Sequence, residues 1–313
     1  MKVPLLSSVT LLAAAQQLAV ALGRPMSVAG PALTKMFVDP PMPRSLREHV
    51  FTGREVLIAT FLKSGTNWAM QIALQIAYRG AAEFDHIHEL VPWPDAPPIK
   101  ELVSLRRASA EVRSPTGKVV IKTHLPASMV PYDPRAAYIT VIRDPKEVAI
   151  SADHFLLGTL GVVDAISFDE WYERMVDDGP VLTAWARHTA GFWAWRGRDN
   201  VLSLTYPQMK ADLDGSVRRF AAIMGVELSA AEHAEVVRRA SFEHMRAHNH
   251  QFSPPTMPLQ RRRELPPMIR RGVAGGSDEL LDARRQRAID ACCQAKLRAL
   301  GCDFPYAEHF ARR

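Results

Sequence analysis

The chain has 313 residues, of which 47% are hydrophobic and 23% are charged, and its formal net charge is +6. This composition excludes a disordered chain and supports one large folded unit, because no linker, low-complexity tract or internal repeat divides the sequence. The charge is modest for the length, and no aromatic or motif pattern accompanies the late arginine clusters. We therefore expect no nucleic-acid partner.

The first segment to stand out is the uncharged stretch from Val3 to Gly23, which lies between Lys2 and Arg24. Its length approaches that of a bilayer span, but polar residues such as Gln16 and Gln17 interrupt it. We expect residues 1–40 to form an apolar extension ahead of a main domain of residues 41–313, either docked on that domain or in weak contact with a membrane. A membrane-spanning segment or a cleaved signal sequence is the alternative.

The most informative segment is an abrupt change of pattern around residue 62. An apolar run, Val56 to Leu62, ends in Lys63-Ser64-Gly65-Thr66, and a helical pattern begins near Asn67. A strand, a glycine turn and a helix start bring backbone N–H groups, an ammonium and hydroxyls together, which is typical of an anion-binding loop. An ordinary strand-to-helix turn is the alternative. The spacing is not that of nucleotide triphosphatases, because the lysine precedes the glycine.

Two further strands carry functional residues at their ends. The strand that begins at Val119 delivers Lys122 and His124 onto one face, and a histidine beside a lysine at such a place is a candidate general base. The strand Tyr138 to Ile142 is followed by Arg143, then by a capped helix that carries Ser151. In a parallel sheet such strand ends meet at one edge, so both groups could share one crevice with the anion loop.

The rest of the chain alternates strands with helices. We expect a strand from Val201, and helices over Asn67–Tyr78, Lys146–Phe155, Leu182–Trp195, Ser216–Met224 and Ala230–Arg239. This order predicts an α/β fold: a single domain with a central parallel sheet covered by helices on both faces and a P-loop-like turn.

The cysteines and histidines predict no metal site and no disulfide. Cys292, Cys293 and Cys302 are too few for a disulfide framework and indicate a reducing compartment, so we expect a cytoplasmic protein. His244 and its histidine neighbours lack the cysteine or carboxylate that would complete a ligand set.

Taken in order, these segments resemble the cytosolic-type sulfotransferases, which use 3′-phosphoadenosine 5′-phosphosulfate (PAPS). The resemblance covers roughly residues 53 to 300 and adds segments at Tyr206, at Ala240–Met245 and at Met268–Gly272. It implies a P-loop-like turn that binds the phosphosulfate, a general base at His124, and catalytic cations at Lys63 and Lys122. It also implies that the cofactor is held by Lys63, Ser64, Gly65, Thr66, Asn67, Trp68, Arg143, Ser151, Tyr206, Ser241, Phe242, Met245, Arg270, Arg271 and Gly272.

The function implied is in-line transfer of a sulfuryl group from PAPS to a hydroxyl or amine. An atypical P-loop kinase and a non-catalytic nucleotide-binding module are the alternatives. The acceptor pocket should be built from His86–Pro98, Leu156–Val163 and His248–Pro258, which are rich in aromatic and apolar residues. A small hydrophobic alcohol or phenol is therefore the expected acceptor. The sequence makes no prediction of the oligomeric state.

Overall fold

The fold is that of a computed structural model, which describes residues 8–96, 102–157, 164–253, 267–269 and 276–310. For residues 8–14 it describes the backbone only. The strands are β1 (Glu55–Ala59), β2 (Val119–Thr123), β3 (Ala137–Ile142) and β4 (Val201–Thr205). The helices are α1 (Ser8–Ala21), α2 (Met26–Val38), α3 (Arg44–Arg47), α4 (Thr66–Ala77), α5 (Leu105–Ala110), α6 (Pro145–Ala152), α7 (Phe168–Trp171), α8 (Pro180–Trp193), α9 (Tyr206–Ala211), α10 (Leu213–Met224), α11 (Ala230–Arg239), α12 (Phe242–Ala247), α13 (Ala283–Ala299) and α14 (Tyr306–His309). Short π-helical turns follow α6 (η3, Asp153–Leu157) and α7 (η4, Tyr172–Val176).

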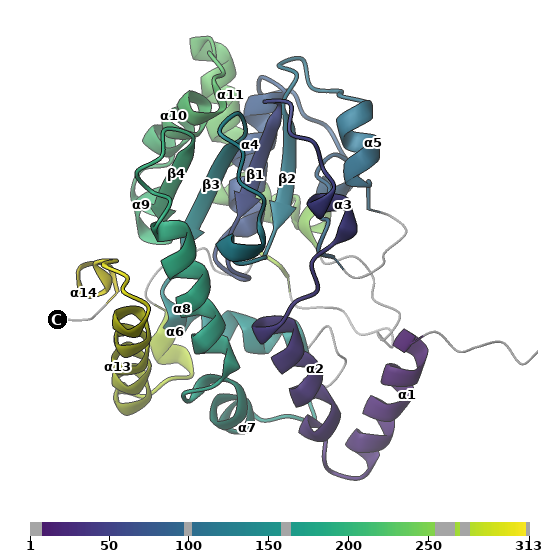
Figure 1. The fold of residues 1–313 in the computed structure, drawn as a ribbon, viewed down its shortest axis with the longest axis vertical. Coiled ribbons are helices and arrows are strands. Elements are labelled where there is room, and N and C mark those ends of the chain that lie inside the picture. Colours follow the sequence, from purple (N-terminus) through teal and green to yellow (C-terminus); the bar gives the residue numbers. More distant parts are fainter. Residues whose placement is uncertain (1–7, 97–101, 158–163, 254–266, 270–275, 311–313) are drawn as a thin grey trace, which may run out of the picture.

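The four strands form one parallel sheet in the order β2-β1-β3-β4. Their apolar, β-branched sequences suit strands that are buried on both faces. Val56 and Ile58 face the side covered by α4, α10 and α11, while Leu57 and Ala59 face α3, α5 and the end of α8. The predicted α/β fold with a parallel sheet between helices is confirmed (Figure 1).

A second layer of helices lies beside the sheet. In Figure 1, α8, α6, α13, α7 and α2 gather below it, and their apolar faces share one buried cluster that includes Trp171 and Trp185. The ammonium of Lys146 is buried in this layer, where it pairs with Asp144 and Asp290 and donates to the Phe310 carbonyl at 3.0 Å. This network fastens α6, whose start faces the strand ends, to the C-terminal helices.

The predicted helices are confirmed, with shifted ends. The helix expected from Ser216 begins at Leu213, because the Asp212 carboxylate caps it by accepting the Gly215 N–H at 2.8 Å. The helix expected over 182–195 spans Pro180–Trp193, and its proline stands in the first turn, where no N–H is needed.

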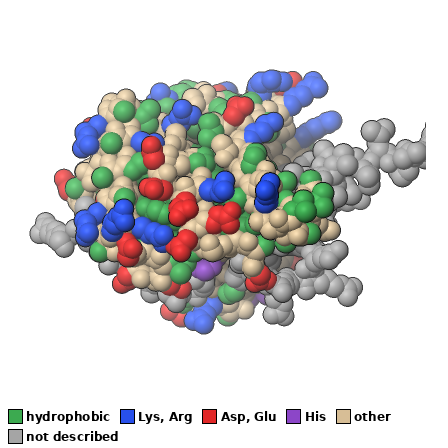
Figure 2. All heavy atoms as spheres, turned by 90° about the horizontal axis from the view of Figure 1, so that it is seen from below, with side chains coloured by type: hydrophobic (Ala, Val, Ile, Leu, Met, Phe, Trp, Pro, Cys, Tyr) green, Lys and Arg blue, Asp and Glu red, His purple; other side chains and the backbone are tan. Residues whose placement is uncertain are grey.

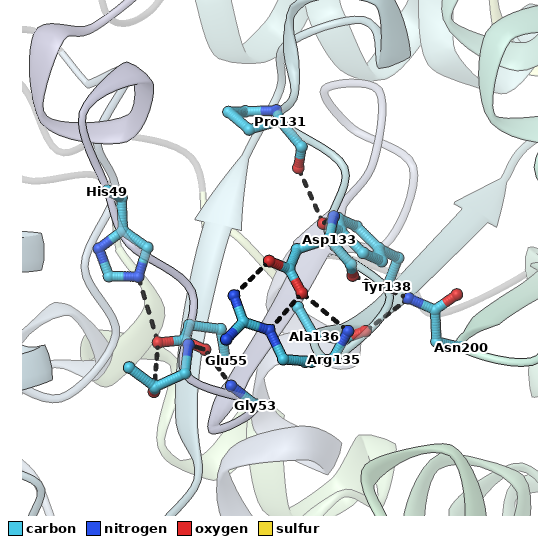
Figure 3. Close-up of polar contacts among 10 residues, drawn as sticks. His49, Gly53, Glu55, Pro131, Asp133, Arg135, Ala136, Tyr138 and Asn200 are labelled. Carbon is cyan, nitrogen blue, oxygen red and sulfur yellow. Dashed lines mark hydrogen bonds and ion pairs between the residues drawn. The ribbon is translucent and has the colours of Figure 1, made fainter.

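Polar side chains form hydrogen bonds at the end of the sheet where β1 and β3 begin (Figure 3). The Glu55 carboxylate is buried and accepts the N–H groups of Thr52 and Gly53. Although burial raises the pKa of Glu55, these hydrogen bonds bring it below its usual value. The Tyr138 hydroxyl donates to the Pro131 carbonyl at 2.8 Å. The functional site lies at the opposite end of the sheet, where the strands end.

The N-terminal helices form a hairpin, with α2 packed against α8. Met26, Ala29, Leu33 and Phe37 are buried in the cluster of the second layer. Among the described residues, no helix combines the length and apolar character needed to cross a bilayer. The boundary at residue 40 stays a prediction.

Candidate active site

One cavity of about 380 Å³ lies at the carboxyl ends of the strands. It is reached by the loop after β1, the end of β2, and the segment after β3. The predicted site residues on its wall are Lys63, Gly65, Thr66, Asn67, Trp68, Lys122, His124, Arg143, Ser151, Tyr206, Ser241, Phe242 and Met245. Ser64 is buried and is not among the lining residues. Arg270, Arg271 and Gly272 lie outside the described residues.

The loop after β1 has the strained backbone expected of an anion cradle. Lys63 and Gly65 both have positive φ, 61° and 89°. A side chain at position 65 would also meet the ring of Tyr206 at 2.9 Å, so glycine is required there on two grounds. The hydroxyls of Thr60 and Thr66 hydrogen bond across the loop at 2.7 Å. The turn then feeds directly into α4, whose first N–H groups carry the partial positive charge of the helix start.

Arg143 ties the second predicted phosphate site to the first. Its Nη1 donates to the Lys63 carbonyl at 2.8 Å, and its Nε donates to Glu147 Oε2 at 2.9 Å. The guanidinium also lies 4.7 Å from the centre of the Tyr206 ring. Two bonds use two of the five guanidinium N–H donors, which leaves donors for a ligand in the cavity. Arg143 therefore lines the cavity and also contacts the loop that carries Lys63.

The end of β2 holds the candidate base in one tautomer. His124 Nδ1 lies 2.8 Å from the Thr60 carbonyl oxygen, which can only accept, so Nδ1 carries the proton and Nε2 keeps its lone pair. Burial, together with the charge of Lys122, holds the pKa of His124 well below its usual value. The imidazole is therefore neutral in the free protein, with its lone pair at Nε2.

Both candidate catalytic lysines lie over aromatic rings. Lys122 Nζ is 3.3 Å from the centre of the Trp93 ring, and Lys63 Nζ is 4.2 Å from that of Phe155. Burial lowers the pKa of Lys122 to about 7, against a smaller opposing effect of Asp95. An anionic ligand would favour the charged form of Lys122.

On the opposite wall, Trp68 packs edge-to-face against Tyr206, with the ring centroids 5.5 Å apart. Its indole N–H donates to the Ala240 carbonyl at 2.8 Å, which fixes the ring beside the start of α12. The Ser241 hydroxyl caps that helix by accepting the His244 N–H. An indole ring held in place in this way offers a face on which a nucleobase can stack.

Comparison with known proteins decides the family. The family model described as "Sulfotransferase domain" matches residues 53–301. The chain belongs to the sulfotransferase family. It is 25% identical over 260 residues to rabbit sulfotransferase 1C2, covering 80% of this chain and 85% of the relative. It is 26% identical over 281 residues to the rabbit amine sulfotransferase, covering 87% and 88%.

The fold agrees with solved structures. Retinol dehydratase in complex with retinol and PAP (adenosine 3′,5′-bisphosphate) superposes with a TM-score of 0.64 over 88% of each chain, at 19% identity. The chain is accordingly an enzyme that moves a sulfuryl group from PAPS to a hydroxyl or amine. The kinase and non-catalytic alternatives are not favoured.

The cavity fits PAPS by its own chemistry. Lys63, Lys122 and Arg143 supply positive charge on its wall, as a ligand with several phosphate and sulfate oxygens requires. The Ser64 hydroxyl is buried and has no hydrogen-bond partner within the part of the chain that the structure describes. Such a group is costly unless a ligand or water satisfies it.

Sequence reasoning overlooked several residues of the sulfotransferase site. Glu147, the ion-pair partner of Arg143, stands four residues after it, and that spacing could have revealed the pair. The Asp95 carboxylate accepts the backbone N–H of His124 at 2.9 Å, and burial raises the pKa of Asp95. No local signal identifies Asp95, because the contact joins residues 29 positions apart.

The expected acceptor segments are partly described. His88 and Trp93 line the cavity from the first segment, and Phe252 and Ser253 line it from the third. The middle segment lies largely outside the described residues, although the preceding Phe155 is on the wall. Among the described residues, no group of histidine, cysteine or acidic side chains could hold a metal ion.

Proposed function

We propose that this sulfotransferase uses His124 as its general base on a small, apolar acceptor. The observation that carries the proposal is the 2.8 Å contact of His124 Nδ1 with the Thr60 carbonyl, which leaves Nε2 as the proton acceptor at the cavity wall. The acceptor hydroxyl or amine gives its proton to this nitrogen as it attacks. A positioned base of this kind contributes about 10²–10⁴-fold to the rate.

Bound PAPS supplies a sulfuryl group that is already activated on a phosphate, so the remaining tasks are alignment and charge neutralisation. Lys63 and Lys122 neutralise the charge that develops on the phosphate side. The backbone N–H groups from Ser64 to Trp68 hold the 5′ end, and Trp68, Phe242 and Met245 hold the base. Arg143 and Ser151 hold the 3′-phosphate. The family resemblance assigns Arg270, Arg271 and Gly272 to the same phosphate, and these three lie outside the described residues.

The acceptor is a hydrophobic alcohol, phenol or amine. The support is the wall around His124, where Trp93, Phe155 and Phe252 present aromatic rings. Trp93 packs edge-to-face on His124, with centroids 5.5 Å apart, so an acceptor that reaches Nε2 must pass an apolar surface. A polysaccharide would require a more polar groove.

The test is turnover of labelled PAPS against a panel of phenols, aliphatic alcohols, amines and oligosaccharides. We expect sulfated products from apolar members of the panel and none from oligosaccharides. Replacing PAPS with ATP and Mg²⁺ should give no transfer. Transfer from ATP, or transfer confined to oligosaccharides, would contradict the proposal.

We further propose that residues 41–313 are the catalytic domain, residues 1–40 an extension, and the cytoplasm the compartment. Cys292, Cys293 and Cys302 are all free thiols, which supports a reducing environment. Mass spectrometry of the protein from its native cell, after thiol blocking, should find all three cysteines reduced. A disulfide-linked Cys302 would contradict this assignment.

A further inference from the structure

Exposed apolar side chains are concentrated on the hairpin of α1 and α2. Among the described residues, eight large hydrophobic side chains are exposed, and five of them are here: Leu18, Val20, Leu22, Met36 and Val38. We refer to these five as the hairpin patch. Leu18 on α1 and Leu22, just after its end, are one helical turn apart and are 61% and 67% exposed. Figure 2 shows hydrophobic side chains gathered at the side of the molecule where Figure 1 places the α1–α2 turn.

The other face of the hairpin packs against the rest of the domain, so the hairpin patch lies on an element with a defined position. Phe37 is buried and stacks on Phe61, with ring centroids 6.0 Å apart. At the turn, the buried Gln16 side chain donates to the Pro25 carbonyl at 3.0 Å. Ala19 is buried while its neighbours on α1 are exposed. One face of the hairpin is thus buried in the domain, and the hairpin patch is exposed on the other.

The charged residues of the first 38 positions are all basic. Before Asp39 the sequence contains Lys2, Arg24 and Lys35 and no acidic residue. Arg24 and Lys35 are both exposed. Around the α1–α2 turn, the exposed Leu18 and Leu22 are followed by the exposed Arg24, and the first carboxylate of the sequence comes only at Asp39, after α2. Such a pattern matches the surface of a bilayer with anionic lipids, where leucines enter the acyl boundary and cations meet the headgroups. α1 has 14 residues, about 21 Å, which suits lying in the interface.

We propose that the α1–α2 hairpin binds the surface of a membrane that contains anionic lipids. Leu18 and Leu22 enter the boundary between headgroups and acyl chains, and Arg24 and Lys35 contact lipid phosphates. The hairpin ends next to the catalytic cavity, because Phe61, the partner of Phe37, precedes the cavity-lining Leu62. The proposal does not depend on the acceptor or on the role of His124.

The test is co-sedimentation of the full chain with vesicles of phosphatidylcholine, alone or with about a third phosphatidylserine. We expect partitioning into the anionic vesicles to be stronger on the order of tenfold, and to fall with added salt. The variant Leu18→Asp/Leu22→Asp should lose at least about tenfold of this partitioning. Both positions are exposed, and unchanged PAP affinity and melting temperature will establish that the variant is folded.

The matched control is Val50→Asp/Leu300→Asp, which places the same two charges on exposed apolar residues outside the hairpin. This variant should partition like the wild type. Three results would overturn the proposal: no binding of the wild type to either vesicle, equal losses in the two variants, or a wild-type dimer in solution that Leu18→Asp/Leu22→Asp converts to a monomer. The last result would identify the hairpin patch as an interface between copies of the chain.

Discussion

Arg143 is assigned to the 3′-phosphate and also donates to the Lys63 carbonyl, so its removal should have unequal effects on two related nucleotides. In Arg143→Met the 3′-phosphate of PAP loses a charge-assisted hydrogen bond, worth about 1.5–3 kcal/mol, or roughly 10- to 150-fold in affinity. The Lys63 carbonyl also loses its donor at 2.8 Å, which loosens the cradle for the 5′ group. This bond acts on 5′-AMP only through the loop and not by direct contact, so 5′-AMP should lose less affinity than PAP, about 2- to 12-fold.

Calorimetric titration of PAP and of 5′-AMP into wild-type and variant protein measures both losses. The control is Arg218→Met, which removes an exposed arginine that pairs with Asp214 on the surface of α10. It should change neither affinity. Equal losses for the two nucleotides in Arg143→Met would refute the reasoning, because only PAP carries the group that Arg143 is assigned to read.

Three further predictions follow from the buried charges. At pH 8 Lys122 is mostly neutral in the free protein, because its pKa is about 7, so binding of PAP should take up close to one proton. Calorimetry in buffers of different ionisation heat would measure this proton uptake, and Lys122→Met should abolish it. If the wild type bound PAP without taking up a proton, the pKa of about 7 for Lys122 would be contradicted. Lys146→Met leaves two aspartates without their buried cation and should lower the free energy of unfolding by about 3–5 kcal/mol, whereas the exposed Arg196→Met should cost under about 1 kcal/mol. Equal midpoints of urea unfolding for Lys146→Met and the wild type would show that the buried ion-pair network does not stabilise the fold. Asp95→Ala should lower kcat about 2- to 12-fold at unchanged PAP affinity. Asp95→Asn should keep kcat close to that of the wild type, because its amide oxygen can still accept the backbone N–H of His124. A loss of PAP affinity instead would assign Asp95 to the cofactor site.

The sequence predicts the elements well where a residue pattern is local. Apolar, β-branched runs identify the four strands, and caps such as Asp144 and Ser229 identify helix starts, because the interaction lies within one turn. The cradle around Gly65 is predictable for the same reason, since its strain is set by neighbouring residues.

Contacts between distant segments could not be predicted in this way. The bond from Arg143 to the Lys63 carbonyl joins residues 80 positions apart, and that from His124 to Thr60 joins residues 64 apart. Both depend on β1 lying between β2 and β3, which no single segment encodes. The tautomer of His124 depends on this strand order, so the sequence predicts a candidate base, and the contact with Thr60 shows which nitrogen keeps its lone pair.

The most direct test of the account is to measure transfer and cofactor binding together in His124→Ala. Sulfuryl transfer from PAPS to a phenol that the wild type accepts should fall by about 10²–10⁴-fold. The affinity for PAP should stay within about threefold of wild type, since His124 is assigned to the acceptor and not to the nucleotide. His233→Ala, which removes a surface histidine paired with Asp214, should leave both quantities unchanged. A His124→Ala enzyme that is folded, binds PAP and transfers sulfate at the wild-type rate would contradict the central claim.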